Sequence, residues 1–246
     1  MIALIPARGG SKRIRRKNTR VLAGHSLLAY TITAALESGV FAEVYVSTED
    51  GEIERIALSY GAEVVLRPAA FAADDSPDIE WVRHALLTCQ LGEGTESWAL
   101  LRPTSPFRSA ETIRRAVSQW TAYGHDYHSL RAVEPVSQHP GKMWRMVVQP
   151  EQPGRIVPFC TYDLVDPPAH SRSTQSLPRV YVQNASLEIA WVETVTQRNS
   201  ISGDRVMPFL TEGYEGFDLN SRDDWLFAEM LVERGLASLP NAVQVQ

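Results

Sequence analysis

Several features that mark common protein classes are missing from this chain of 246 residues, or are scarce in it. Its two cysteines, Cys89 and Cys160, lack CxxC spacing, so neither a disulfide scaffold nor a zinc ribbon is supported. No apolar run is long enough to span a membrane, and no positive charge precedes the apolar run at 2–7, as it would in a signal peptide. We therefore expect a cytoplasmic protein with reduced thiols and no membrane partner.

The motifs of several catalytic classes are absent as well. The six histidines do not show the H-E-x-x-H spacing of zinc enzymes, and no G-x-S-x-G elbow marks a serine hydrolase. A Walker loop needs glycine directly before its lysine, whereas Ser11 precedes Lys12. A dinucleotide fingerprint needs three spaced glycines, whereas only the pair Gly9 and Gly10 is present. None of these classes is supported.

Acidic residues are absent from the first 36 positions, and Glu37 is the first in the chain. That segment has a local charge of +7, from Arg8, Lys12, Arg13, Arg15, Arg16, Lys17 and Arg20. The rest of the chain holds 17 basic and 29 acidic residues, so the net charge of −5 hides an acidic body with one basic segment. This distribution disfavours a nucleic-acid binder and favours one anion site near the N-terminus.

Strand and helix patterns alternate along the first half of the chain, and 44% hydrophobic residues are enough for one large core. Short apolar runs predict strands at 2–7, 43–48, 62–66, 97–102 and 128–133. Amphipathic patterns predict helices at 26–38, 50–60, 76–90 and 109–123. This order predicts an α/β fold with an open, mostly parallel, doubly wound sheet, whose ligands bind beyond the carboxyl ends of the strands.

Three helices carry signals at their ends. Gly39 is placed to end the first helix, and Ser76 is placed as the N-cap of the third, with Pro77 in its first turn. Ser221 and Asp224 form a capping-box-like pair at the start of the last helix. The apolar face of that helix is expected to consist of Leu226, Phe227, Met230 and Leu231.

The alternation stops at about 134–182, where Pro, Gly, Ser and His dominate. We interpret this segment as an irregular lobe inserted into a single domain that spans 1–246. Strand character returns at 179–192 and 204–210.

The loop at 8–18 is the first candidate site, because it leaves the carboxyl end of the first predicted strand. Glycines let backbone N–H groups turn toward an anion, and lysine and arginine add charge-assisted hydrogen bonds, as a triphosphate requires. A solvated basic loop is the alternative interpretation. The position of the loop and its charge density favour a phosphate site.

The same loop also carries a family resemblance. The segment IPARGGSKRIRRKN resembles the N-terminal signature of the acylneuraminate cytidylyltransferases, which make CMP-activated nonulosonic acids. Further segments follow in that family's order: VSTED at 46–50, LRP at 66–68, LRPTSPFR at 101–108, YVQNAS at 181–186 and FDLN at 217–220. The resemblance covers nearly the whole chain and implies a Rossmann-like nucleotidyltransferase fold.

The resemblance implies a nucleotide site. The residues that it places against the triphosphate and the nucleotide are Arg8, Gly9, Gly10, Ser11, Lys12, Lys17 and Asn18. Arg67 resembles an arginine near the base, Asp78 stands where sialate enzymes often have a small hydroxyl residue, and Arg102 stands where some relatives have glutamine. On sequence alone, Arg67 and Arg102 are equally well explained as surface arginines at strand ends.

A metal site and an acceptor site are implied as well. Asp218 and Asn220 stand where the family shows two aspartates that bind Mg²⁺, although both are also common turn residues. The acceptor residues implied are Lys142, Arg172, Gln183 and Asn184. In this family the lobe commonly reaches over a neighbouring subunit, which implies a homodimer; Lys142 and Arg172 could equally be rim residues of a mobile loop.

The sequence therefore predicts Mg²⁺-dependent transfer of CMP from CTP to the anomeric hydroxyl of a sialic-, legionaminic- or pseudaminic-type acid, with release of pyrophosphate. Arg8, Lys12 and Lys17 are the expected catalytic residues, and no general base is identifiable. The first alternative is a nucleotidyltransferase for another base or acceptor, such as a shorter keto-deoxy acid. The second is a non-catalytic protein that binds nucleotides or polyanions.

Overall fold

The computed structural model describes residues 1–89, 95–149, 152–160 and 167–245. It divides into two compact units, one of Met1–Val133 with Gln183–Gln246 and the other of Glu134–Val182. No helix in the described part of the chain combines the length and apolarity needed to cross a membrane.

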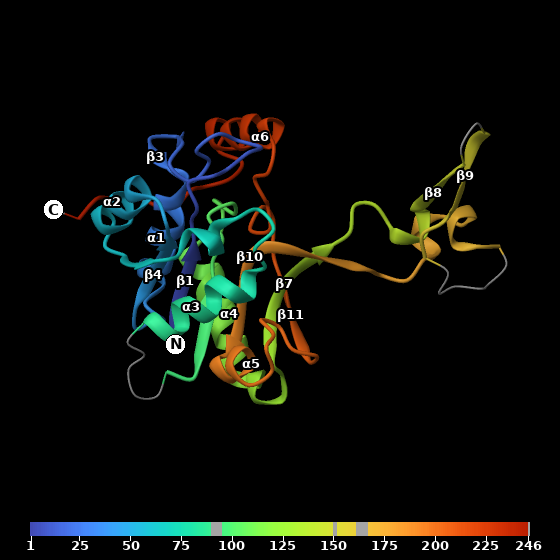
Figure 1. Ribbon diagram of the computed structural model, residues 1–246. Helices are drawn as coiled ribbons and strands as arrows, with labels where there is room; N and C mark the ends of the chain where they lie inside the picture. Colours follow the sequence, from blue (N-terminus) through green and yellow to red (C-terminus); the bar gives the residue numbers. More distant parts are fainter. Residues whose placement is uncertain (90–94, 150–151, 161–166, 246) are drawn as a thin grey trace. The chain divides into compact units, whose positions relative to one another are not determined.

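The first unit is built on a seven-stranded sheet in the order β11-β7-β10-β6-β1-β4-β5 (Figure 1). Its strands are β1 Ile2–Pro6, β4 Val44–Thr48, β5 Glu63–Leu66, β6 Ser97–Leu100, β7 Ser129–Pro135, β10 Tyr181–Trp191 and β11 Val206–Leu210. The pairs β1–β4, β1–β6, β4–β5 and β7–β11 are parallel, whereas β10 runs antiparallel to β6. The mostly parallel sheet predicted from the sequence is confirmed. A small hairpin of β2 (Val21–Leu22) and β3 (His25–Ser26) was not predicted.

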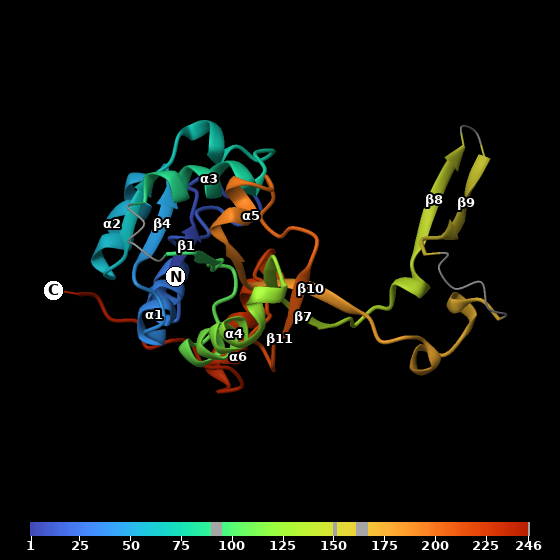
Figure 2. The ribbon, with the colours of Figure 1, turned by 90° about the horizontal axis from the view of Figure 1, so that it is seen from below.

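Helices cover both faces of the sheet. They are α1 Leu27–Ser38, α2 Gly51–Ser59, α3 Asp78–Thr88, α4 Ala110–Tyr123, α5 Val192–Thr196 and α6 Arg222–Glu233. Figure 2 shows α1 and α4 on one face of the sheet and α3 and α5 on the other. Alternate residues of β1 serve the two faces: Ala3 and Ile5 join the core on the α1 side, and Ile2 and Leu4 join the core on the α3 side. A strand buried on both faces has to be apolar throughout, which explains the continuous apolar run.

The helix ends match the sequence signals in part. Gly39 ends α1 with a φ of 66°, a left-handed conformation that suits glycine. The N-cap assigned to Ser76 is wrong, because α3 begins at Asp78 and Pro77 holds the cap position. Ser76 Oγ instead donates to Glu80 Oε2 at 2.7 Å. The expected helix end at residue 90 lies outside the described residues.

Helix α6 begins as predicted but buries a partly different face. The capping box of Ser221 and Asp224 is present. The buried side chains of α6 are Trp225, Ala228 and Leu231, whereas Leu226 and Phe227 are exposed. The expected face was therefore wrong at Leu226 and Phe227, whereas Leu231 is buried and Met230 packs against the core as expected. Trp225 is the residue that sets the observed face, since it reaches the core while Arg20 stacks over its ring at 4.5 Å.

The second unit contains regular structure that the composition did not predict. Strands β8 (Trp144–Gln149) and β9 (Gln152–Pro158) pair as an antiparallel hairpin. A buried histidine organises the segment before it: His139 Nδ1 accepts from the N–H of Gly141 at 3.0 Å, and its Nε2 lies 2.9 Å from the carbonyl oxygen of Pro178. The lobe was expected to be irregular, and this expectation is wrong for the residues of the hairpin.

The strand order explains where a ligand can bind in the first unit. After β1 the chain continues to β4 on one side, whereas β6 pairs on the other side of β1. Where the loops after two neighbouring parallel strands run in opposite directions, a crevice opens between the loops at the carboxyl ends of those strands. The loops after β1 and β6 are therefore among those expected to line a site.

Candidate functional site

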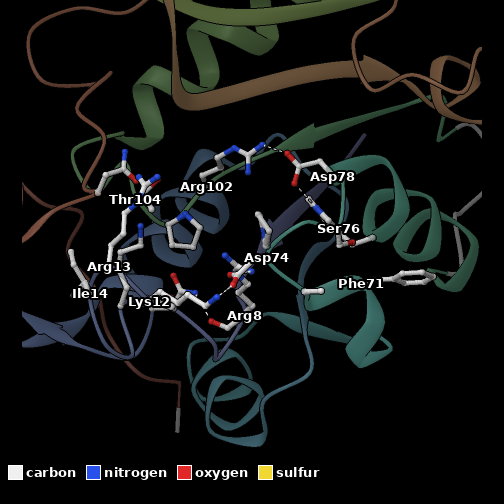
Figure 3. Close-up of a pocket in the computed structure, with 18 of the residues that line it drawn as sticks. Arg8, Lys12, Arg13, Ile14, Phe71, Asp74, Ser76, Asp78, Arg102 and Thr104 are labelled. Atoms are coloured by element: carbon white, nitrogen blue, oxygen red, sulfur yellow. Dashed lines mark hydrogen bonds and ion pairs between the residues drawn. The ribbon is translucent and has the colours of Figure 1, made fainter. Parts of the chain in front are cut away.

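A cavity of about 540 Å³ opens at the carboxyl ends of β1 and β6 (Figure 3). The residues that line it are Pro6, Arg8, Ser11, Lys12, Arg13, Ile14, Lys17, Asn18, Arg67, Phe71, Ala73, Asp74, Ser76, Asp78, Trp81, Arg102, Pro103, Thr104 and Asn220. Nine of the site residues predicted from the sequence are among them. The cavity has a cationic end, formed by the loop after β1, and an end lined by aromatic side chains and buried polar groups.

Asp74 supplies the negative charge at the cationic end. Its Oδ1 lies 2.9 Å from Arg8 Nη1, and its Oδ2 forms an ion pair with Lys12 (Figure 3). The hydrogen bond from Lys12 is the main cause that holds the pKa of Asp74 below its ordinary value. Arg8 also donates to the carbonyl oxygen of Ala72 at 3.2 Å. The two cations are therefore gathered around one carboxylate.

The glycines of the loop act differently from the expectation. The N–H of Gly9 donates to Glu49 Oε1 at 2.8 Å, so it is directed at the protein rather than at an anion. A Cβ at Gly9 would lie 2.4 Å from Asp50 Oδ2, which only glycine avoids. Gly9 and Gly10 are not among the lining residues described above, whereas Ser11 is. Gly9 therefore permits a close approach between two loops.

Lys17 and Asn18 have separate roles at the end of the loop. Lys17 Nζ donates to the carbonyl oxygen of Leu219 at 3.0 Å. Burial lowers the pKa of Lys17, and the nearby carboxylate of Asp218 opposes this effect. Asn18 is buried, and its Nδ2 donates to the carbonyl oxygen of Arg8 at 3.0 Å. Asn18 therefore fixes the shape of the loop, and Lys17 is a cation presented to the cavity.

Arg67 marks the other end and is not a surface arginine. It is 7% exposed, and its Nη2 donates to the carbonyl oxygen of Ser47 at 2.7 Å. Its guanidinium lies over the ring of Trp81, 5.5 Å from the centroid. Desolvation lowers the pKa of Arg67, and Glu49 opposes this most among the charged groups around it. A guanidinium fixed beside an indole suits a planar polar ligand.

Asp78 and Arg102 are both in the cavity, and they bind each other. Arg102 Nη2 lies 2.5 Å from Asp78 Oδ2 (Figure 3). Trp81 Nε1 donates to Asp78 Oδ1 at 2.8 Å. Burial would raise the pKa of Asp78, but the charge of Arg102 and its hydrogen bond outweigh this and lower it. Glu188 lies on the far side of Arg102, 3.8 Å from Nη2. Two of the positions that depart from the family pattern therefore form one ion pair.

Asp218 and Asn220 contact each other through their side chains. Asn220 Nδ2 donates to Asp218 Oδ2, and the N–H of Asn220 donates to Asp224 Oδ2 at 2.9 Å. The pair offers a carboxylate and an amide oxygen beside Lys17, and oxygen donors of this kind suit Mg²⁺ when substrate phosphates complete the shell. No group of three or more His, Cys, Asp and Glu is arranged for a metal within the ranges that the structure describes.

The predicted acceptor residues divide between the two units. In the first unit, Gln183 Oε1 accepts from Arg131 Nη1 at 2.5 Å, and Asn184 Nδ2 donates to Thr211 Oγ1 at 2.9 Å. In the second unit, Lys142 Nζ donates to the carbonyl oxygens of His170, at 3.2 Å, and of Arg172. Lys142 therefore contacts the backbone on both sides of Ser171.

The residues that contact the site or its arginines and that were not predicted include Glu49, Asp74, Trp81 and Thr104. Glu49 lies within VSTED, which the sequence singled out only as part of a resemblance. Thr104 accepts the N–H of Leu219 at 2.8 Å through its carbonyl oxygen, a backbone contact that has no sequence signal. Asp74 and Trp81 act through ion-pair and hydrogen-bond partners that are distant in the sequence or that depend on how α3 begins.

Asp74→Asn should strengthen the binding of an added polyphosphate. The substitution removes the carboxylate that occupies Arg8 and Lys12, and because these ion pairs are exposed to solvent the gain in affinity should be modest, about fivefold at most. Calorimetric titration with inorganic tripolyphosphate at low ionic strength measures the change. Asp75→Asn makes the same change of charge one residue away and serves as the control; equal affinities for the two variants would contradict this role of Asp74.

Asp78→Ser and Arg102→Gln should be energetically coupled. Each single variant leaves a part-buried charge with fewer partners, whereas the double variant removes both, so its cost should fall short of the sum by about 0.5 kcal/mol or more. Urea denaturation of the four proteins gives the coupling in the free energy of unfolding. The exposed pair Arg114 and Glu111, both changed to Gln, is the control expected to be additive within about 0.5 kcal/mol. Additive costs at Asp78 and Arg102 would contradict the coupling.

Comparison with known proteins agrees with this geometry. Residues 2–140 match the family model described as cytidylyltransferase. The chain is 36% identical over 236 residues to the CMP-N,N'-diacetyllegionaminic acid synthase of Legionella pneumophila, covering 95% of this chain and 96% of that protein. It is 48% identical over 117 residues to the N-acylneuraminate cytidylyltransferase of Escherichia coli, covering 48% of this chain and 27% of that one.

A solved structure shares the fold. The structure of CMP:2-keto-3-deoxy-manno-octonic acid synthetase complexed with CTP matches with a TM-score of 0.67 at 12% identity, covering 95% of this chain and 98% of that one. The family match spans more than half of the chain, and the relative from Legionella spans nearly all of it. The chain described here belongs to the cytidylyltransferase family.

Proposed function

We propose that the protein transfers CMP from CTP to the anomeric hydroxyl of a nonulosonic acid and releases pyrophosphate. The observation that carries this proposal is the cavity itself, which has basic side chains from the loop after β1 at one end and Arg67 against Trp81 at the other. A nucleoside triphosphate has the matching chemistry, with negative charge at one end and a planar base at the other. The relative from Legionella, a CMP-sugar acid synthase, supports this acceptor class.

The cationic end would do most of the catalytic work. In-line attack on an α-phosphate needs reactants that are held in position and a place for the charge that develops on the phosphate oxygens. Arg8 and Lys12 exchange Asp74 for the triphosphate, and Lys17 faces the cavity from the other end of the loop. These three residues fix the triphosphate and neutralise its charge, while Asn18 keeps the loop in shape.

No lining residue is suited to act as a general base. Asp74 and Asp78 are the carboxylates among the lining residues given above, and both are ion-paired. Their lowered pKa values make them weak bases. We therefore assign catalysis to positioning and charge neutralisation rather than to proton abstraction by one side chain.

We also propose that Asp218 and Asn220 hold Mg²⁺ when the nucleotide is bound. The carboxylate of Asp218 and the amide oxygen of Asn220 are suitable oxygen donors beside Lys17. The metal would supply charge stabilisation at the phosphate oxygens. Asn220 is itself positioned through its N–H by Asp224, which belongs to the capping box of α6.

We expect a cytoplasmic enzyme. Both cysteines are free, and burial raises the pKa of Cys89 to about 11, so its thiol stays protonated and unreactive.

Pyrophosphate release measured with each of the four nucleoside triphosphates tests the activity. The panel of acceptors contains sialic, legionaminic and pseudaminic acids and a shorter keto-deoxy acid, each with and without Mg²⁺. We expect release with CTP alone that depends on a nonulosonic acid and on Mg²⁺. Preference for another base or for the shorter acid would favour the first alternative. Salt-sensitive RNA binding without turnover would favour the non-catalytic alternative.

Lys17→Ala should reduce kcat/KM at least about a hundredfold, because it removes a cation from the phosphate end of the cavity. The melting temperature and circular dichroism spectrum should stay close to those of the wild type, since the lysine contributes one backbone hydrogen bond to the fold. Arg15→Ala, in the same basic segment but outside the lining, is the matched control. Near-normal activity of Lys17→Ala would overturn its assignment.

We propose that a homodimer forms through the hairpin of the second unit. Three residues at alternate positions of β8 share one face: Trp144, Met146 and Val148, which are 42%, 69% and 76% exposed. Ile156 of β9 pairs with Met146 in the hairpin register and is 55% exposed. An apolar sheet face of this kind favours association with a complementary surface, and the family resemblance points to a second copy.

Light scattering during size-exclusion chromatography should give a mass of twice 27.4 kDa. The double variant Met146→Glu and Val148→Glu places charges on the apolar face and should shift the mass to 27.4 kDa. Arg145→Gln changes the neighbouring position of the same strand, whose side chain points to the other face, and should leave the dimer intact. A dimer that survives the double variant would exclude this face.

A further inference from the structure

We propose that Glu49 is a positioning residue that couples the two ends of the nucleotide cavity. One of its carboxylate oxygens holds the phosphate-binding loop through the N–H of Gly9, and the other faces the buried guanidinium of Arg67. The inference rests on the proposed function, because it assigns the loop to the triphosphate and Arg67 to the base end. Glu49 itself is not among the lining residues described above, so it acts through these two partners.

Its location allows both contacts. Glu49 directly follows β4, which lies between β1 and β5 in the sheet. Gly9 follows β1, and Arg67 follows β5. The three carboxyl ends are neighbours, so a side chain from the middle strand reaches both of the others. The distances are 2.8 Å from Glu49 Oε1 to the N–H nitrogen of Gly9 and 3.8 Å from Oε2 to Arg67 Nε.

The Arg67 guanidinium depends on this carboxylate. Within the described ranges, Glu49 carries the one carboxylate at ion-pair distance from Arg67. The other groups that fix the guanidinium are neutral: the carbonyl oxygens of Ser47, at 2.7 Å, and Phe71, at 3.4 Å. A buried cation without a counter-charge is strongly unfavourable, so Glu49 compensates the charge that Arg67 brings to the base end.

The loop contact depends on a rigid turn. Asp50 Oδ1 accepts from the N–H groups of Glu52 at 2.9 Å and Ile53 at 3.1 Å, which caps α2 and fixes the backbone next to Glu49. The N–H of Asp50 donates to Thr48 Oγ1 at 3.1 Å. Gly9 lies against this turn so closely that a Cβ would overlap with Asp50. The position of Arg8, the next residue back, is thereby tied to the turn that carries Glu49.

Glu49→Gln and Glu49→Ala separate the two contacts. The amide of Gln keeps an acceptor for Gly9 but has no charge for Arg67, whereas Ala loses both. We expect Glu49→Ala to raise both KM and Kd for CTP about tenfold or more, since a charged hydrogen bond and an ion pair are removed, with smaller changes in kcat and in KM for the acceptor. Glu63→Gln, on the exposed edge strand β5, is the matched control and should leave all constants unchanged.

Two fragments of the nucleotide give the readout that a merely structural residue would not change. Inorganic tripolyphosphate probes the loop, and cytidine probes the base end. Glu49→Gln should weaken cytidine binding more than tripolyphosphate binding, whereas Glu49→Ala should weaken both. Binding is measured by calorimetry at a temperature at which every variant is folded, as shown by its melting curve.

Unchanged KM for CTP and unchanged fragment affinities in both variants would overturn the proposal. So would an equal loss of both fragments in Glu49→Gln, because the amide retains the loop contact. If Glu49→Ala does not fold, Glu49→Gln alone still shows whether cytidine binding is weakened more than tripolyphosphate binding. A wild-type protein without turnover on any acceptor would overturn the proposed function instead, and tripolyphosphate binding would still test the contact between Glu49 and Gly9.

Discussion

Mutual repulsion among the cations of the N-terminal segment is the constraint on which the site depends. The chain resolves it by bringing acidic residues from separate segments to that loop. Asp74 pairs with Arg8 and Lys12, Asp50 and Glu52 lie beside Arg16, and Asp218 lies near Lys17. The acidic body of the chain therefore serves as the counter-charge of its basic segment. A negatively charged ligand can enter by replacing part of that counter-charge, and Asp74, the most exposed of these acids, is the part most readily replaced.

The fold was largely predictable because its signals are local. The continuous apolar run at β1 reflects burial on both faces, and Gly39 and Ser221 mark helix ends through conformations that one or two residues decide. The errors arose where tertiary contacts outweighed local pattern. In α6, Trp225 packs into the core where Leu226 and Phe227 were expected to do so, and in α3 Pro77 holds the cap position expected for Ser76.

The cationic residues of the site could be predicted from the sequence, but the ion pairs that they form could not. The loop after β1 can be recognised from charge and position, and a resemblance adds Arg67, Asp78 and Arg102 by register. That Asp78 and Arg102 bind each other could not be derived, because 24 positions separate them and the contact exists only when α3 begins beside the loop after β6. Likewise, Gly9 looked like a phosphate-binding glycine, but the structure shows that it allows one loop to pack against another.

Leu219 shows how a junction can escape sequence comparison. Its N–H is bound to Thr104 and its carbonyl oxygen to Lys17, so the loops after β1 and β6 and the segment before α6 meet at one peptide backbone. Any residue except proline offers the same two groups. The residue type at this position among relatives would therefore reflect only how its side chain packs. The contacts that join the three segments would be kept whatever that residue type is, proline excepted.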